Sequence, residues 1–215
     1  MVRLLVDNTE IETTEGTSLL QACLENDIFI PNLCYIKGMD NPPASCRMCF
    51  VEINGEEIPV TACTVKVLDG MVVKTDTPSV RRLQRTAFKL LMSVHDVDCA
   101  HCPANKKCDL QRIAKFLKVG LKPKSLEPFL KESETQEDHP CLDYYPNRCV
   151  LCGKCIHVCR TLHGKPVMAF ARRGFHTVLS FYGTENSAFC AQCHACADIC
   201  PVSAITLKTG SIQAT

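Results

Sequence analysis

Seventeen of the 215 residues are cysteines, and eight of them fall into two short runs with identical spacing. The first run is CVLCGKCIHVC, at positions 149–159, and the second is CAQCHACADIC, at positions 190–200. Both follow the pattern C-x2-C-x2-C-x3-C, and Pro201 comes directly after the second. A chain with this repeat must gather many sulfur atoms, so cysteine chemistry constrains its fold more than its hydrophobic pattern does.

The cysteines are predicted to be metal ligands and not disulfide partners. Disulfide scaffolds with this much cysteine form in oxidising compartments. The N-terminal sequence MVRLLVDNTE has a short apolar run that Asp7 and Asn8 interrupt, unlike the apolar region of a signal peptide. No apolar run approaches the roughly 18 residues of a membrane span, and a net charge of +1 gives no electrostatic case for binding nucleic acid. We therefore expect a cytoplasmic protein with reduced thiols.

The spacing of the two runs is typical of bacterial ferredoxins that hold two [4Fe–4S] clusters, in which the fourth cysteine of each run binds the other cluster. This pattern divides the eight cysteines into two crossed sets. One set is Cys149, Cys152, Cys155 and Cys200, and the other is Cys159, Cys190, Cys193 and Cys196. The alternative is two zinc sites, but zinc has no use for a third cysteine at fixed spacing, so the sequence favours iron–sulfur clusters.

Residues 1–77 have the pattern of a compact α+β domain. VRLLV and EIETT flank the turn DNT as an opening hairpin, and Ser18 with Gln21 predicts a capping box at the start of a helix. The sequence NG at 54–55 is a strong hairpin signal, and DG at 69–70 repeats it between KVL and MVVKT.

Four cysteines of this first domain are candidate cluster ligands. Plant-type [2Fe–2S] sites use C-x4-C-x2-C with a remote fourth cysteine, and the wide first gap here departs from that spacing. The loop would have to wrap a cluster with backbone N–H groups, and a structural zinc site is the alternative. The four residues are Cys34, Cys46, Cys49 and Cys63.

Residues 78–120 are predicted to be helical. Pro78 can begin a helix, and a second helix near 109–118 is expected to end with Gly120 as its C-cap. Basic residues lie mostly off the apolar face of the first helix, where we expect a solvated surface; the alternative is a docking face for an acidic partner. They are Arg81, Arg82, Arg85 and Lys89.

The stretch HDVDCAHCPANKKC, at positions 95–108, holds a third group of ligands. Cys99, Cys102 and Cys108 supply three thiolates and need a fourth ligand. His95 ends a helix that would hold it in place, which favours it. His101 competes, but it lies inside the C-x2-C loop, where its side chain would point away from a metal bound to that loop.

The remaining segments are a linker, predicted at 121–140 from its prolines and its charged run, and a cysteine-rich domain at 141–209. Two cysteines stay outside the ligand sets. Cys23 is predicted to be a core residue of its helix, and Cys141 receives no role.

In this order, LCYIKGMDNPPASCRMCFVEI, HDVDCAHCPANKKCDLQ and the two ferredoxin-type runs resemble the iron–sulfur region shared by three kinds of protein. These are the large iron–sulfur subunit of respiratory complex I, the N-terminal part of [FeFe]-hydrogenases, and the small diaphorase subunit of soluble NAD-linked hydrogenases, formate dehydrogenases and bifurcating enzymes. The resemblance extends from residue 1 to about 209. It implies a β-grasp [2Fe–2S] domain, a small [4Fe–4S] domain with one histidine and three cysteine ligands, and a two-cluster ferredoxin domain. By this resemblance His95 is the fourth ligand.

Within that group, the diaphorase-type subunit fits best. The complex I subunit looks to have lost one of the two ferredoxin-type clusters, whereas all eight cysteines are present here. A hydrogenase would continue into a catalytic domain, and this chain stops soon after Cys200.

No G-x-G-x-x-G or G-x-x-x-x-G-K-[ST] motif for a nucleotide is present, and no nucleophile–base arrangement is evident. We therefore expect a non-catalytic subunit with one [2Fe–2S] and three [4Fe–4S] clusters. By resemblance, it carries electrons between a flavin/NAD(H) subunit and a catalytic or ferredoxin-facing subunit of a hetero-oligomer. The alternatives are a stand-alone multi-cluster carrier and a zinc-binding interaction module.

Overall fold

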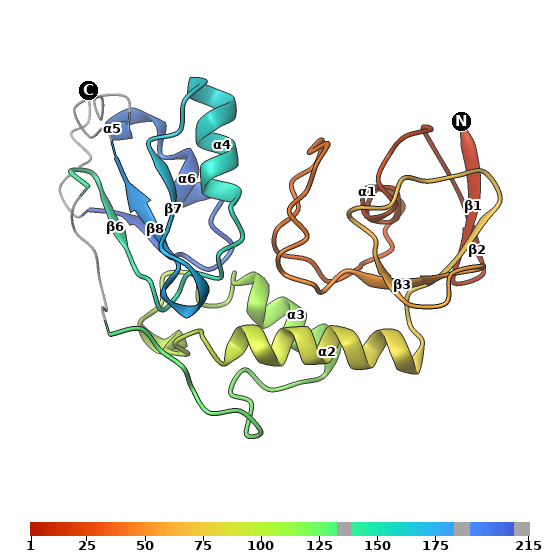
Figure 1. Ribbon diagram of the computed structural model, residues 1–215, viewed down its shortest axis with the longest axis horizontal. Helices are drawn as coiled ribbons and strands as arrows, with labels where there is room; N and C mark the ends of the chain where they lie inside the picture. The colour runs from red at the N-terminus through yellow and green to blue at the C-terminus, as the bar shows by residue number, and fades with distance from the viewer. Residues whose placement is uncertain (133–138, 183–189, 209–215) are drawn as a thin grey trace. The chain divides into compact units, whose positions relative to one another are not determined.

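The structure is a computed structural model of the chain, and it describes all residues except 133–138, 183–189 and 209–215. The chain divides into two compact units (Figure 1). The first unit contains Met1–Leu90 and Ile113–Gly120, and the second contains Leu91–Arg112 and Leu121–Thr215. Segment 78–120 contributes to both units, and its assignment as a separate domain stays a prediction.

A five-stranded sheet forms the frame of the first unit, with the strand order β2-β1-β5-β3-β4. Strand β5 pairs in parallel with β1 and antiparallel with β3, and the other pairs are antiparallel. The α+β prediction for this region is confirmed. The strands are β1 (Val2–Val6), β2 (Thr9–Thr13), β3 (Phe50–Ile53), β4 (Val60–Thr61) and β5 (Met71–Lys74).

The predicted opening hairpin is confirmed. Val6 pairs with Thr9, and the two turn residues Asp7 and Asn8 have φ angles of 48° and 70°. Two consecutive left-handed residues are what a type I′ turn requires. Alternate side chains of β1 are buried, which matches the period of a strand with one face on a core.

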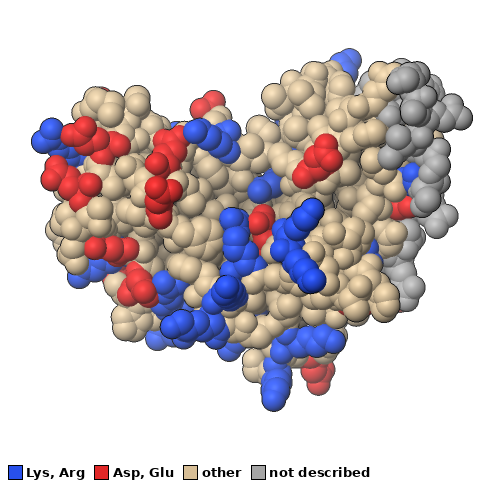
Figure 2. Space-filling view, turned by 180° about the vertical axis from the view of Figure 1, so that it is seen from behind, with Lys and Arg blue, Asp and Glu red and all other residues tan. Residues whose placement is uncertain are grey.

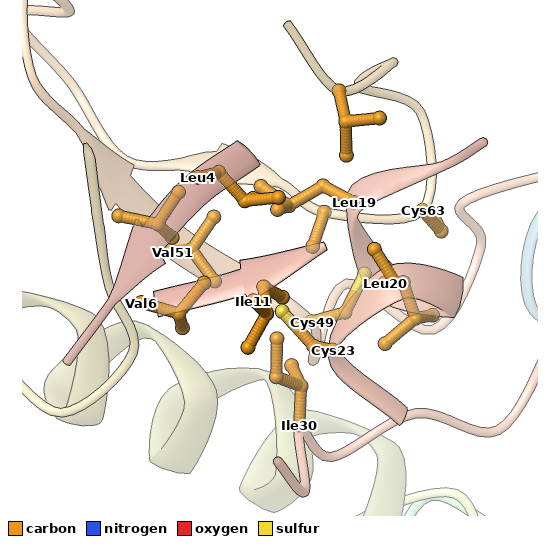
Figure 3. Close-up of a cluster of buried hydrophobic side chains, with 14 of the residues drawn as sticks. Leu4, Val6, Ile11, Leu19, Leu20, Cys23, Ile30, Cys49, Val51 and Cys63 are labelled. Carbon is orange, nitrogen blue, oxygen red and sulfur yellow. The ribbon is translucent and has the colours of Figure 1, made fainter. Parts of the chain in front are cut away.

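Apolar side chains from the sheet meet those of α1 (Leu19–Glu25) in one core, in which Cys23, Cys49 and Cys63 are also buried (Figure 3). The prediction that Cys23 is a core residue is confirmed. Only half of the predicted capping box forms. Ser18 accepts a hydrogen bond from the backbone N–H of Gln21, but the Gln21 side chain binds Tyr35 and Glu25 instead of returning to Ser18.

The second predicted hairpin, around positions 69–70, does not form. Gly70 takes a positive φ of 73° and its N–H donates to the carbonyl of Arg3, so the turn leads into β5. Because β5 is already paired with β1 on one side and β3 on the other, no ladder position is left for a strand from KVL.

Helix α2 (Pro78–Met92) begins at the predicted proline, and α3 (Asp109–Leu117) lies where a second helix was expected. In the first unit, Gln84 of α2 donates to the carbonyl of Phe50 at 3.0 Å, which ties the helix to β3. Arg85 donates to the carbonyl of Leu117 at 3.0 Å and so joins α2 to the end of α3.

Gly120 is not the C-cap of α3, and that prediction is wrong. Lys118 takes the left-handed position with a φ of 54°. Its N–H bonds to the carbonyl of Lys115, and the N–H of Val119 bonds to that of Ala114. These two bonds define a Schellman motif, in which the left-handed residue is usually glycine.

The basic side of α2 is mostly solvated. Arg82, Arg85 and Lys89 are exposed, and Lys and Arg side chains gather on the face seen in Figure 2. Arg81 differs from them, because it pairs with Asp76 and stacks over the ring of Phe116.

The second unit contains two two-stranded sheets and several short helices around a core that includes cysteines. Strand β6 pairs with β9, and β7 pairs with β8. The strands are β6 (Leu142–Tyr144), β7 (Met168–Ala171), β8 (Val178–Phe181) and β9 (Ile205–Leu207). The helices are η1 (Cys99–His101), α4 (Lys154–His163), η2 (Gly174–His176), α5 (Cys190–Cys193) and α6 (Ala195–Asp198).

The segment predicted as a linker is anchored where the structure describes it. Phe129 donates its N–H to the carbonyl of Ser93 at 2.6 Å, and the Asn147 side chain binds both backbone groups of Lys131. Most of the charged run at 131–139 lies outside the described residues. Across the described ranges, no helix is long and apolar enough to cross a membrane.

We expect Lys118→Gly to stabilise α3 by about 0.5–1 kcal/mol. The substitution removes the cost of a left-handed non-glycine residue, and the greater freedom of glycine in the unfolded chain offsets part of that gain. Native-state hydrogen exchange of the α3 amides should slow by about 2- to 5-fold. Lys118→Ala is the control, because it removes the charge but keeps the Cβ atom. Equal slowing in both variants would contradict the backbone explanation.

Candidate iron–sulfur sites

The loop between α1 and β3 contains Cys34, Cys46 and Cys49, and Cys63 follows β4; all four cysteines of the first group are buried. The Sγ atoms of Cys34 and Cys46 are 3.4 Å apart. The hydrogen bond from Cys46 lowers the pKa of Cys34 to about 5, and the same contact raises the pKa of Cys46. Ala44 and Arg47 have φ angles of 49° and 50°, so the chain reverses sharply on both sides of the first ligand of the CRMC pair.

The second pair of this group shows the same relation. A hydrogen bond from Cys49 lowers the pKa of Cys63, while the nearby charge of Cys34 raises it. Backbone amides also point at the sulfurs: those of Met48 and Leu33 donate to Cys46. Four thiols and several N–H donors therefore surround one buried place, which is the donor set that a [2Fe–2S] cluster uses.

In the middle group, η1 and the turn before α3 bring three thiols together. Burial raises the pKa of Cys108 most, and the charges of Cys102 and Cys99 add to it. The N–H of Asp109 also donates to the carbonyl of Pro201 at 3.2 Å, which ties this group to the end of the second ferredoxin-type run.

The two candidate histidines of this group lie in different environments. His95 is half-buried, its Nδ1 is 3.0 Å from the carbonyl oxygen of Arg148, and burial lowers its pKa. A neutral ring that donates from Nδ1 keeps Nε2 as a lone-pair ligand, which is the arrangement found in metal-binding histidines. The His101 side chain is 82% exposed and pairs with Asp98 at 2.8 Å. Among the described residues, the hydrogen bond found for the His95 ring joins Nδ1 to the carbonyl of Arg148 and not to a cysteine sulfur.

Cysteines of both ferredoxin-type runs line one cavity of the second unit. Three come from the first run and Cys200 comes from the second, and the walls include Phe170 and Leu179. The free space among them is about 20 Å³, little more than one water molecule needs. The thiols that share this cavity are Cys149, Cys152, Cys155 and Cys200.

Polar groups reach two sulfurs of this cavity. The N–H of Ala204 donates to Sγ of Cys200 at 3.1 Å. The buried hydroxyl of Tyr144 accepts the N–H of Leu179 at 3.1 Å and donates to Cys149. Burial raises the pKa of Tyr144, and the charge of Cys149 raises it further.

The other four cysteines of the runs are also neighbours. Burial raises the pKa of Cys196 to about 12, and the charges of Cys190, Cys159 and Cys193 contribute in that direction. Cys141 lies close enough to Cys190 to raise the pKa of that thiol as well. No spacing pattern points to this fifth thiol, which directly precedes β6 and whose carbonyl accepts the N–H of Lys208, the residue after β9.

The two runs share a backbone conformation. Gly153 and His194 each follow the second cysteine of their run, have φ angles of 75° and 52°, and cap the next helix. Only glycine adopts this conformation at low cost, so His194 holds it under strain. The two runs therefore turn in the same way after their second cysteine.

No three His, Cys, Asp or Glu side chains in the described ranges converge as ligands of a single metal ion would. Ligands of a cluster bind different iron atoms and need not converge on one point. The chemistry of the donor sets, which is thiolate with backbone N–H groups and apolar walls, fits iron–sulfur clusters.

Comparison with known families supports this chemistry. Residues 1–78 match the family of 2Fe-2S iron-sulfur cluster binding domains, and residues 84–121 match the NADH-ubiquinone oxidoreductase-G iron-sulfur binding region. The predictions of a [2Fe–2S] domain and of a following iron–sulfur region are confirmed by these matches. The count of four clusters and the individual ligands stay predictions.

Three curated proteins show the range of relatives. NADPH-Fe(3+) oxidoreductase subunit alpha of Geobacter sulfurreducens is 32% identical over 208 residues, which are 97% of this chain and 24% of that protein. An NADH-quinone oxidoreductase subunit of Rickettsia prowazekii is 31% identical over 100% of this chain and 31% of its own length. NADP-reducing hydrogenase subunit HndD of Solidesulfovibrio fructosivorans is 30% identical, over 95% and 36%. The chain thus spans about a quarter to a third of these relatives.

Among solved structures, the chain is similar to one in the crystal structure of NAD+-reducing [NiFe]-hydrogenase in the H2-reduced state. The TM-score is 0.82 with 28% sequence identity, and the likeness covers 100% of this chain and 90% of that one. It therefore includes the region after residue 121, which neither family match covers.

We expect His95→Ala to lose one [4Fe–4S] cluster or leave a labile three-iron form, because Nε2 of His95 is the predicted fourth ligand. His95→Cys should keep a cluster of lower potential, since a thiolate adds negative charge. His101→Ala should change neither. Potentiometric EPR titration of the three variants measures this. Loss of the cluster in His101→Ala, with a native spectrum in His95→Ala, would show that the wrong histidine was assigned.

Proposed function

We propose that this chain is the electron-transfer subunit of an NAD(P)-linked oxidoreductase complex. Two findings support this: its residues match iron–sulfur families, and it is similar to an NADH-quinone oxidoreductase subunit and to NADP-reducing hydrogenase subunit HndD. Its partners would be a flavin/NAD-binding subunit on one side and a catalytic or ferredoxin-facing subunit on the other. The chain itself carries out no substrate chemistry in this proposal.

The proposed cofactors are one [2Fe–2S] cluster in a β-grasp domain and three [4Fe–4S] clusters. The [2Fe–2S] ligands are Cys34, Cys46, Cys49 and Cys63. The first [4Fe–4S] cluster has His95, Cys99, Cys102 and Cys108. The two ferredoxin-type clusters have Cys149, Cys152, Cys155 and Cys200, and Cys159, Cys190, Cys193 and Cys196.

The observation that carries the proposal is the cavity shared by cysteines of both runs. Cys200 joins three cysteines that precede it by more than forty positions in the sequence, as the crossed ligand pattern of two-cluster ferredoxins requires. Two independent zinc sites would instead keep the cysteines of each run together.

When bound, the clusters accept and release single electrons, and the residues of this chain set the conditions for that exchange. Thiolates hold the iron, and N–H donors such as that of Ala204 offset negative charge on the sulfurs. Apolar walls such as Phe170 and Leu179 exclude water. The proposed compartment is the cytoplasm, where thiols stay reduced and free to bind iron.

The fully loaded chain should contain about 14 iron atoms, two from the [2Fe–2S] cluster and four from each [4Fe–4S] cluster. Cys46→Ala should lower this to about 12, because a buried ligand is lost. Cys23→Ala is the matched control in the same domain and should keep about 14, since Cys23 lies in the core of α1. Iron and zinc are measured by mass spectrometry of anaerobically reconstituted protein. Saturation near eight irons, or stoichiometric zinc, would refute the four-cluster assignment.

The isolated chain should neither reduce NAD nor oxidise NADH, because electrons have to enter through a flavin subunit. The tagged chain, purified anaerobically together with its native partners, should show bleaching of the cluster absorbance when NADH or NADPH is added. Visible spectra of the two samples make the comparison. Steady NAD turnover by the isolated chain would contradict the electron-transfer proposal.

A further inference from the structure

Helix α4 places a histidine next to the ligands of one ferredoxin-type cluster. Cys155, Cys159 and His163 are spaced by four residues, so they lie on one face of the helix. Both cysteines are buried, whereas His163 is exposed in the last turn. Gly164, with a φ of 72°, ends the helix, and its N–H donates to the carbonyl of Arg160 at 2.8 Å. This hydrogen bond therefore holds the last turn of α4, from which the His163 side chain extends.

His163 contacts a proposed cluster ligand from another helix. Its Nε2 lies 3.2 Å from Sγ of Cys193, which belongs to α5 and comes 30 residues later in the chain. A thiolate that is bound to iron has no proton to donate, so only the imidazole can be the donor. The contact requires a proton on Nε2 of His163.

The two ferredoxin-type clusters differ in the donors that reach their sulfurs. The set that contains Cys200 receives the backbone N–H of Ala204 and, at Cys149, the buried hydroxyl of Tyr144. The set that contains Cys193 receives the side chain of His163, at an exposed helix end. Both sets consist of four thiolates, so the ligands alone do not separate the potentials of the clusters. Hydrogen bonds to sulfur and solvent exposure do.

We propose that His163 tunes the potential of the [4Fe–4S] cluster held by Cys159, Cys190, Cys193 and Cys196, by donating Nε2–H to the Cys193 thiolate. A hydrogen bond to a thiolate stabilises the reduced cluster more than the oxidised one, because the reduced cluster carries more negative charge. His163 therefore raises the potential of this cluster. The inference rests on the ligand sets proposed above.

The test uses reconstituted full-length protein and potentiometric EPR titration. His163→Leu removes the donor but keeps apolar bulk over Cys193, and His163→Gln retains a neutral N–H donor. His157→Leu is the control on the same helix, because His157 lies two positions from each of the two cysteines of α4 and so faces elsewhere. Cys193→Ala removes a proposed ligand and so identifies which signal belongs to this cluster.

His163→Leu should shift the potential of the Cys193 cluster downward and leave the other clusters unchanged. His163→Gln should restore part of the shift, and His157→Leu should shift none. An unchanged potential in His163→Leu overturns the inference, and so does a shift in His163→Gln as large as in His163→Leu, since a charge effect would then replace the N–H···S bond. Retention of every cluster signal in Cys193→Ala would instead overturn the proposed ligand set, which keeps the two failures distinguishable.

Discussion

The structure depends on the burial of thiols that have to be thiolates when iron is bound. Cys49 and Cys63 belong to the core of the first unit, and Cys155, Cys159 and Cys196 belong to that of the second. Burial raises the pKa of Cys155 and Cys196, and the hydrogen bond with Cys63 raises that of Cys49, so these three thiols are protonated in the protein alone. In the proposed sites iron would replace those protons, and cluster binding would then be part of the folding free energy.

The short spacing between the proposed ligands is accompanied by strained backbone conformations beside them. Ala44 and Arg47 in the first group, and Leu151 and His194 in the ferredoxin-type runs, all take positive φ angles without being glycine. Each lies within three residues of a proposed ligand. Such conformations persist where the surroundings determine them, and here they turn the loop so that successive cysteines face the same place.

Features that depend on local sequence could be predicted, and features that depend on which segments meet could not. The type I′ turn at Asp7 and the start of α2 at Pro78 follow from residues close together in the chain. The misassigned C-cap shows the limit, because Lys118 accepts a left-handed conformation once α3 is held by Arg85 of α2. The spacing of cysteines predicted groups that the structure does bring together. The approach of His163 to Cys193 needed the packing of α4 beside the second run, and no pattern within either segment reveals it.

A backbone hydrogen bond from Asp96 to Asn147 lies next to the hydrogen bond between His95 and Arg148. The N–H of Asp96 donates to the carbonyl of Asn147 at 2.7 Å. His95 and Asp96 therefore bind the carbonyls of Arg148 and Asn147, which directly precede Cys149. These two contacts hold the proposed ligand His95 beside the start of the first ferredoxin-type run, although about fifty residues separate the two in the chain. Under the proposed ligand sets, these two contacts would help to fix the distance that an electron tunnels between the two clusters.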